Sequence, residues 1–195
     1  MRLSNNPPRD RLVEDWEITE ALSIESQYRG VQIAQPYIRL KLLTGLRRND
    51  LLRLKLSDLK EDGIHVQPSK TRASSGKRLI FKWDDELRAV IETIKQIKPH
   101  RIGDSHLFTT RQGKPYIDER GKCNAFDSLW QRFMDKVMTD TKVTDRFQER
   151  DLRAKVATDS NTLLEASERL GHSDTGITQR VYRRKPIVIE PLKRT

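Results

Sequence analysis

Basic side chains and one tyrosine occur together near the end of this 195-residue sequence, in the run Arg180-Val181-Tyr182-Arg183-Arg184. A phenol titrates near pH ~10, so a nucleophilic tyrosine needs surroundings that favour the phenolate. Neighbouring arginines supply a positive field of this kind, and their planar forks also bind phosphate oxygens. These residue types therefore suit Tyr182 to act as a nucleophile, although on its own the tyrosine is better explained without that role. The simpler alternative is a half-buried helix residue with its hydroxyl in water.

Two further arginine segments precede this one. In Thr44-Gly45-Leu46-Arg47-Arg48-Asn49-Asp50 one helix is expected to end and another to begin, so Arg47 could reach a phosphate beside free backbone N–H groups. Asp50 could hold that arginine in place. In Arg150-Asp151-Leu152-Arg153 the two arginines are three residues apart and share one helix face. Taken singly, each segment is better explained as a solvated basic surface.

Several other kinds of chemistry have no motif in the sequence. There is no GxGxxG, P-loop, HExxH or GxSxG pattern. The single Cys123 excludes an internal disulfide and a cysteine zinc site. The histidines do not fall at metal-ligand spacing with Cys or carboxylates: His65, His100, His106 and His172. The sequence therefore predicts a protein that works without a metal or an organic cofactor.

The charge balance points to a polyanionic partner. Lys and Arg total 38 against 28 Asp and Glu, a net charge of +10. Residues 39–82 and 146–195 carry the whole excess, so folding could join them into one basic face. DNA or RNA is favoured over an acidic membrane, although lysines and arginines also keep proteins soluble. No run is long enough to span a membrane and no signal peptide opens the chain, so we expect a cytoplasmic protein.

The elements that must position these residues are mostly helical. Apolar spacing predicts helices beginning near residue 12 and over 31–43, 49–56, 84–98, 126–137, 149–159, 162–169 and 175–184. Alternation around Ile64 and Leu79 predicts two short strands joined by a turn at residues 74–76. The expected fold class is α+β, mainly α-helical, with a small antiparallel hairpin near residues 63–82.

Together, and in this order, these segments resemble the catalytic domain of the tyrosine recombinases, the phage integrase family, over residues 9–185. The resemblance rests on TGLRRNDLL, Ser69-Lys70-Thr71, RDLRAK, LGHSD and the tyrosine that follows. It implies five catalytic residues: Arg47, Lys70, Arg153, His172 and Tyr182. It also implies supporting roles for Asp50 and Arg150. Five matches in register over so much of the chain make the resemblance specific.

The sequence departs from the family pattern at two points. Arg150 stands where the H-x-x-R box usually has histidine, and arginine cannot readily accept a proton. The duty of general base would then fall to His172, to solvent or to the phosphate itself. Tyr182 lies ten residues after His172, where the family commonly has nine.

The resemblance implies a site-specific recombinase or integrase domain that cuts and rejoins double-stranded DNA through a 3′-phosphotyrosyl intermediate. Such proteins work as tetramers on paired sites, although an isolated domain could be monomeric. We expect residues 1–8 to be a linker or a disordered start, 9–185 the catalytic domain and 186–195 a tail that docks in cis or in trans. Since the chain has no room for the family's core-binding domain, we expect an isolated catalytic domain.

Three alternatives stay open at this stage. A type IB topoisomerase uses the same residue types to nick and reseal DNA. A degenerate recombinase, with Arg150 as a sign of lost activity, would bind DNA without cutting it. An RNA-binding protein fits the charge but does not explain the ordered set of five residues.

Overall fold

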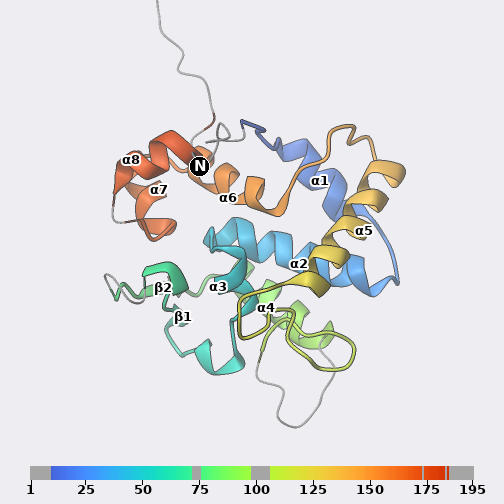
Figure 1. The fold of residues 1–195 in the computed structure, drawn as a ribbon, viewed down its shortest axis with the longest axis horizontal. Coiled ribbons are helices and arrows are strands. Elements are labelled where there is room, and N and C mark those ends of the chain that lie inside the picture. The colour runs from blue at the N-terminus through green and yellow to red at the C-terminus, as the bar shows by residue number, and fades with distance from the viewer. Residues whose placement is uncertain (1–9, 72–75, 98–105, 173, 183, 185–195) are drawn as a thin grey trace, which may run out of the picture.

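The computed structural model describes residues 10–71, 76–97, 106–172, 174–182 and 184, and these form a mainly helical body with one two-stranded sheet (Figure 1). The α-helices are α1 (Asp15–Ser23), α2 (Arg29–Thr44), α3 (Arg48–Leu52), α4 (Asp85–Ile97), α5 (Asn124–Asp140), α6 (Glu149–Asp159), α7 (Leu163–Arg169) and α8 (Thr175–Ile177). The predicted α+β class is confirmed. The predicted linker and tail lie outside the described residues.

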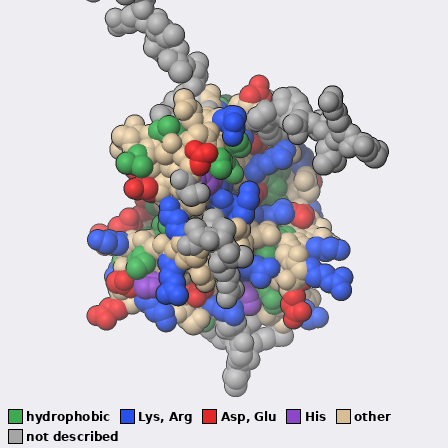
Figure 2. Space-filling model, turned by 60° about the vertical axis from the view of Figure 1, so that its left-hand side comes forward, with side chains coloured by type: hydrophobic (Ala, Val, Ile, Leu, Met, Phe, Trp, Pro, Cys, Tyr) green, Lys and Arg blue, Asp and Glu red, His purple; other side chains and the backbone are tan. Residues whose placement is uncertain are grey.

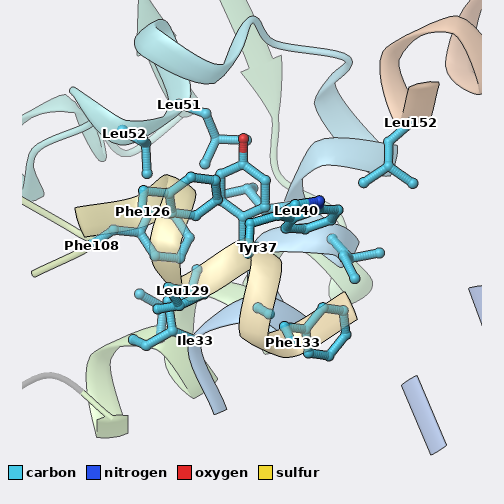
Figure 3. Close-up of a cluster of buried hydrophobic side chains, with 14 of the residues drawn as sticks. Ile33, Tyr37, Leu40, Leu51, Leu52, Phe108, Phe126, Leu129, Phe133 and Leu152 are labelled. Atoms are coloured by element: carbon cyan, nitrogen blue, oxygen red, sulfur yellow. The ribbon is translucent and has the colours of Figure 1, made fainter. Parts of the chain in front are cut away.

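Helix α2 lies in the middle of the fold, where it contacts α4, α5 and α6 (Figure 1). Its Tyr37 ring packs 4.5 Å from the Phe126 ring and 5.6 Å from the Phe108 ring, centroid to centroid (Figure 3). Gly45 ends the helix at φ 64° and donates its N–H to Lys41 O at 2.7 Å. Glycine adopts this left-handed conformation without steric cost, as the sequence predicted.

The hairpin pairs β1 (Gly63–Val66) with β2 (Leu79–Lys82) in antiparallel register, with Val66 opposite Leu79. Inward and outward side chains alternate along β2, as expected for a strand with one covered face. The connecting loop starts with a 3₁₀ turn at Ser69–Thr71, which carries Lys70. Most of the predicted turn at 74–76 lies outside the described residues.

Two helices end differently from the prediction. The helix expected over 49–56 stops at Leu52, because the chain then pairs with a distant segment: Leu107 donates its N–H to Leu54 O at 2.8 Å, and Lys55 forms an isolated bridge with His106. Near the C-terminus, α8 gives way to a π-helical turn at Thr178–Tyr182.

No helix in the described ranges is both long and apolar enough to cross a membrane.

A buried ionic contact fixes the start of α6 against α2. Lys41 is only 1% exposed, and its Nζ bonds Glu149 Oε1, which also accepts from the Tyr37 hydroxyl at 2.7 Å. Burial lowers the pKa of Lys41, and the charge of Glu149 opposes that fall. Glu149 is the first residue of α6, so this contact sets where the arginines of α6 stand.

We expect Glu149→Gln to lower the free energy of unfolding by about 3–5 kcal/mol, because it leaves the buried ammonium of Lys41 without its counter-charge. The double variant Lys41→Met/Glu149→Gln removes both charges and should lose less. Asp140→Asn breaks the exposed pair with Lys136 and should cost under about 1 kcal/mol. Urea unfolding measures all three, and equal losses for Glu149→Gln and Asp140→Asn would contradict the assignment.

Candidate active site

An open cavity of about 610 Å³ brings together three of the cations that the sequence singled out, Arg47, Lys70 and Arg150. They come from the turn before α3, the hairpin loop and the first turn of α6. Arg48 also lines this cavity, but its Nη1 is paired with Asp127 Oδ1 at 2.6 Å. Figure 2, which turns the hairpin side of Figure 1 towards the reader, shows Lys and Arg side chains across the middle of this face.

Arg153 is placed differently from its neighbour on α6. Arg150 is exposed at the cavity, whereas Arg153 is only 4% exposed. Its Nη1 donates to Gly45 O, and its Nη2 lies 2.7 Å from Leu170 O. The predicted shared solvated face is therefore wrong for Arg153, because these two carbonyls draw its guanidinium inside. The contacts join α6 both to the turn that carries Arg47 and to the LGH segment.

The Arg153 guanidinium remains charged at neutral pH despite its burial. Burial lowers its pKa to about 10, with a further lowering by Arg47 and an opposing effect from the Tyr182 phenol. Its Nε is buried and has no hydrogen-bond partner among the described residues. Arg153 therefore keeps its charge and one unused donor inside the site.

His172 lies directly against Arg153, with 3.1 Å between His172 Nε2 and Arg153 Nη2. The imidazole is 7% exposed. Burial is the largest cause that lowers the pKa of His172 to about 4, followed by the positive charges of Arg153, Arg47, Lys70 and Lys77. His172 is therefore neutral at pH 7, and four cations surround it.

Tyr182 completes the cluster as the last residue of the π-helical turn. Its ring centroid lies 5.1 Å from that of His172 and 5.3 Å from Arg153 Cζ. A π turn holds one more residue between hydrogen-bonded groups than an α turn. This turn therefore accommodates the extra residue between His172 and Tyr182 without moving the ring out of the cluster.

Of the three arginines beside Tyr182 in the sequence, Arg184 has a partner other than the phenol, and Arg183 lies outside the described residues. Arg184 Nη1 lies 2.9 Å from Asp151 Oδ1, a carboxylate that is fully buried in α6. Its charge is balanced there, and Arg180 is exposed. The positive group against the Tyr182 ring is instead Arg153, which lies 29 residues earlier in the chain.

Asp50 contacts the lysine loop. Its Oδ1 accepts a hydrogen bond from the Ser69 N–H at 2.8 Å, and no ion pair joins it to Arg47 within the described part of the chain. Asp50 thus holds the start of the segment that carries Lys70. Its predicted contact with Arg47 is not among the contacts of the described residues, and its support of Arg47 stays a prediction.

Sequence reasoning missed two kinds of residue around the cluster. Lys77, on the far side of the hairpin loop from Lys70, places its Nζ 3.4 Å from His172 O. A second lysine in one loop was a visible signal for it. Two buried threonines, Thr158 and Thr178, also contact the cluster. No spacing rule distinguishes them from other helix threonines.

The arrangement suits binding and reaction of a phosphate. Arg47, Lys70 and Arg150 line an open cavity, and a buried arginine, a neutral imidazole and a phenol lie together beside them. Such preorganised donors stabilise negative charge that develops in a transition state. In the described ranges no group of three or more His, Cys, Asp or Glu side chains could hold a metal ion.

The sequence and the fold are each similar to known proteins. The sequence model described as "Phage integrase family" matches residues 17–186. Similar solved structures include a lambda integrase tetramer bound to a Holliday junction (15% identity, TM-score 0.67, 99% of this chain and 54% of that chain). XerA recombinase is 16% identical at TM-score 0.68 and covers 91% of this chain and 61% of that chain.

The Tn1549 transposon integrase in complex with circular intermediate DNA is also similar, at 16% identity and TM-score 0.66 over 94% of this chain and 64% of that chain. The chain thus spans a little over half the length of these structures. No curated protein matches the sequence.

We expect His172 to make the free energy of unfolding depend on pH. Its pKa is about 4 in the folded protein against 6.5 ordinarily, so the unfolded state binds more protons between these values. The free energy of unfolding should therefore fall as the pH is lowered from 6.5 to 4, by up to about 3 kcal/mol from this residue.

Urea unfolding of the unmodified protein and of His172→Gln at a series of pH values measures this effect. Above pH 7, where the imidazole is neutral in both states, the difference between the two proteins should be constant. As the pH falls to 4, the unmodified protein should lose stability relative to His172→Gln, because only its imidazole must take up a proton on unfolding. A difference that stays constant down to pH 4 would show that the pKa is not lowered.

Proposed function

The chain belongs to the phage integrase family, and from this premise we propose that it is the catalytic domain of a site-specific recombinase that cuts and rejoins DNA through Tyr182. The observation that carries the proposal is the packing of Tyr182 against both Arg153 and His172, beside the cavity that holds Arg47 and Lys70.

In the proposed cleavage step, the phenol oxygen of Tyr182 attacks a backbone phosphorus. A bond forms between that oxygen and phosphorus while the bond to the 5′-oxygen breaks. The product is a 3′-phosphotyrosyl link and a free 5′-hydroxyl, whose proton comes from Lys70. The reverse reaction rejoins the strand, and because the phosphodiester is conserved no external energy source is needed.

Arg47 and Arg153 would contact the non-bridging oxygens of the phosphate. Two guanidiniums are suited to this because the pentacovalent transition state carries more negative charge on those oxygens than the ground state. Loss of one such donor costs on the order of 3 kcal/mol in comparable oxyanion sites. The unused Nε–H of Arg153 supports this role, since most of its other donors already bind the protein.

Arg150 would add a positive contact at the cavity and cannot serve as the proton acceptor. His172 is also poorly suited to that duty, because Arg153 already donates to its Nε2 and its pKa is about 4. We therefore assign the phenol proton to solvent or to a phosphate oxygen.

The proposed partners are double-stranded DNA in the cytoplasm and further copies of the recombinase on paired sites. The similar structures support both, since they are described as a lambda integrase tetramer on a Holliday junction and a XerH recombinase bound to its difH substrate. Since those chains are longer, choice of the DNA site would depend on parts outside the region of similarity as well.

We expect the unmodified protein to form a covalent adduct with nicked duplex DNA and Tyr182→Phe to form none, because the phenylalanine ring lacks the attacking oxygen. The probe is a pool of duplexes of random sequence, labelled at the 5′ end of the strand that carries a nick. The short fragment beyond the target phosphate then diffuses away after cleavage. The adduct is detected on a denaturing gel by its loss on protease treatment.

Each alternative gives a different pattern in this assay. An adduct with Tyr182→Phe would show that another residue is the nucleophile. DNA binding without any adduct from the unmodified protein would identify a non-catalytic module. Relaxation of supercoiled plasmid without joining of separate sites would identify a topoisomerase.

DNA binding should weaken steeply with salt, because neutralised phosphates release counterions. Arg150→Ala should lower the slope of log affinity against log salt by about one, with little dependence on sequence. Lys142→Ala removes an exposed cation that does not line the cavity and should leave the slope unchanged. Fluorescence anisotropy with a labelled duplex measures these slopes, and equal slopes for Arg150→Ala and Lys142→Ala would exclude the cavity as a phosphate site.

A further inference from the structure

The two ends of the π-helical turn are held by threonine hydroxyls. At its first residue, Thr178 Oγ1 lies 2.8 Å from His172 Nδ1. At its last residue, Tyr182 O lies 3.1 Å from Thr158 Oγ1, which comes from α6. Both threonines are buried, at 0% and 3% exposure.

The partners of His172 fix which ring nitrogen carries the proton. Arg153 has only N–H donors, so at 3.1 Å its Nη2 must donate to His172 Nε2. Nε2 is therefore the unprotonated acceptor, and in a neutral ring the proton lies on Nδ1. That N–H then donates to Thr178 Oγ1, which is the partner of Nδ1 among the described residues.

The neutral ring follows from all the groups that surround it. Arg153 on α6, Arg47 before α3, and Lys70 and Lys77 from the hairpin loop are all positive, and after burial they are the largest causes that lower the pKa of His172. A protonated Nε2 would also place its N–H against an N–H of Arg153, and neither group could accept the other's hydrogen. Arg153 therefore sets the tautomer, and the hydroxyl of Thr178, which can donate or accept, holds the ring at Nδ1.

Thr158 fixes the other end of the turn by a different contact. Its hydroxyl accepts from the Arg184 N–H at 3.1 Å and can donate its one hydrogen either to Tyr182 O or to Ala154 O, at 2.8 Å. The bond to Ala154 is ordinary within a helix. The contacts of Thr158 with residues 182 and 184 lie outside the helix. They attach the tyrosine segment to α6, which carries Arg153.

We propose that Thr178 and Thr158 are positioning residues for the site, Thr178 by bonding Nδ1 of His172 and so holding the ring against Arg153, and Thr158 by holding the backbone of Tyr182 against α6. The effect on DNA cleavage rests on the proposed function, whereas the effect on the His172 ring does not.

The tautomer is tested on the free protein by long-range ¹H–¹⁵N correlation of the imidazole rings at pH 7, with the His172 signals assigned from a His172→Gln sample. In the unmodified protein we expect a protonated Nδ1 and an unprotonated Nε2. Thr178→Val keeps the shape of the side chain but removes the acceptor of the Nδ1–H group, and should shift the Nδ1 signals while Nε2, which still accepts from Arg153, stays unprotonated. Thr178→Ser should restore the original pattern.

Thr139→Val is the matched control. Like Thr158, Thr139 donates its hydroxyl to the carbonyl four residues earlier, but it is exposed near the end of α5. It should leave the His172 signals unchanged. An Nε2–H tautomer in the unmodified protein would overturn the proposal without the need of any variant. So would a Thr178→Val spectrum identical to that of the unmodified protein.

Cleavage is tested with the same labelled pool of nicked duplexes. Thr178→Val and Thr158→Val should each lower the rate constant of adduct formation at saturating protein by about five- to tenfold, the effect of one lost hydrogen bond. The protein concentration that gives half-maximal rate should stay within about twofold, and Thr158→Ser and Thr178→Ser should recover most of the rate.

The outcomes separate this proposal from the proposed function. If the unmodified protein forms no adduct, the proposed function fails, while the spectra still decide the role of Thr178. If the unmodified protein forms the adduct and both valine variants react at its rate, the positioning roles are wrong and the proposed function stands. Loss of DNA binding in step with the rate would also contradict a positioning role.

Discussion

The buried guanidinium of Arg153 is the contact on which the site depends. It binds the carbonyls of Gly45 and Leu170 and the imidazole of His172, and it lies against the Tyr182 ring. These partners come from the end of α2 and from the segments that follow α7 and α8, so one side chain of α6 holds together regions far apart in the sequence. A planar group with five donors can do this, whereas lysine could not bind several acceptors in fixed directions.

This arrangement costs electrostatic energy in the free protein. Arg47, Lys70 and Lys77 act on the same imidazole as Arg153, and all four lower the pKa of His172. Like charges this close repel one another, and burial makes the repulsion stronger than in water. Other parts of the fold offset the cost, since the buried Lys41–Glu149 contact anchors α6 and the paired Arg184 and Asp151 neutralise each other. The positive charge around His172 thus belongs to the place where we propose that a phosphate binds.

The sequence was sufficient to predict local structure and the identity of the cluster, but not its internal contacts. The end of α2 at Gly45 and the bounds of α6 followed from backbone preference and apolar spacing, which act within a few residues. The burial of Arg153 and the bond from Ser69 to Asp50 depend on which distant carbonyl or N–H group the fold brings into contact with the side chain. Periodicity contains no such information. For the same reason, the sequence suggested that Arg184 acts on Tyr182, whereas its partner is Asp151.

The π-helical turn explains how the longer spacing is tolerated. An extra residue in a regular helix would rotate Tyr182 by about 100° around the helix axis, since an α-helix has 3.6 residues per turn. A wide turn absorbs that residue locally, but it has weaker regular bonding and needs other contacts to hold its shape. The hydroxyls of Thr178 and Thr158 supply them at its two ends. The longer spacing and the two buried threonines therefore belong together, because the threonine contacts hold the turn that keeps the phenol beside Arg153.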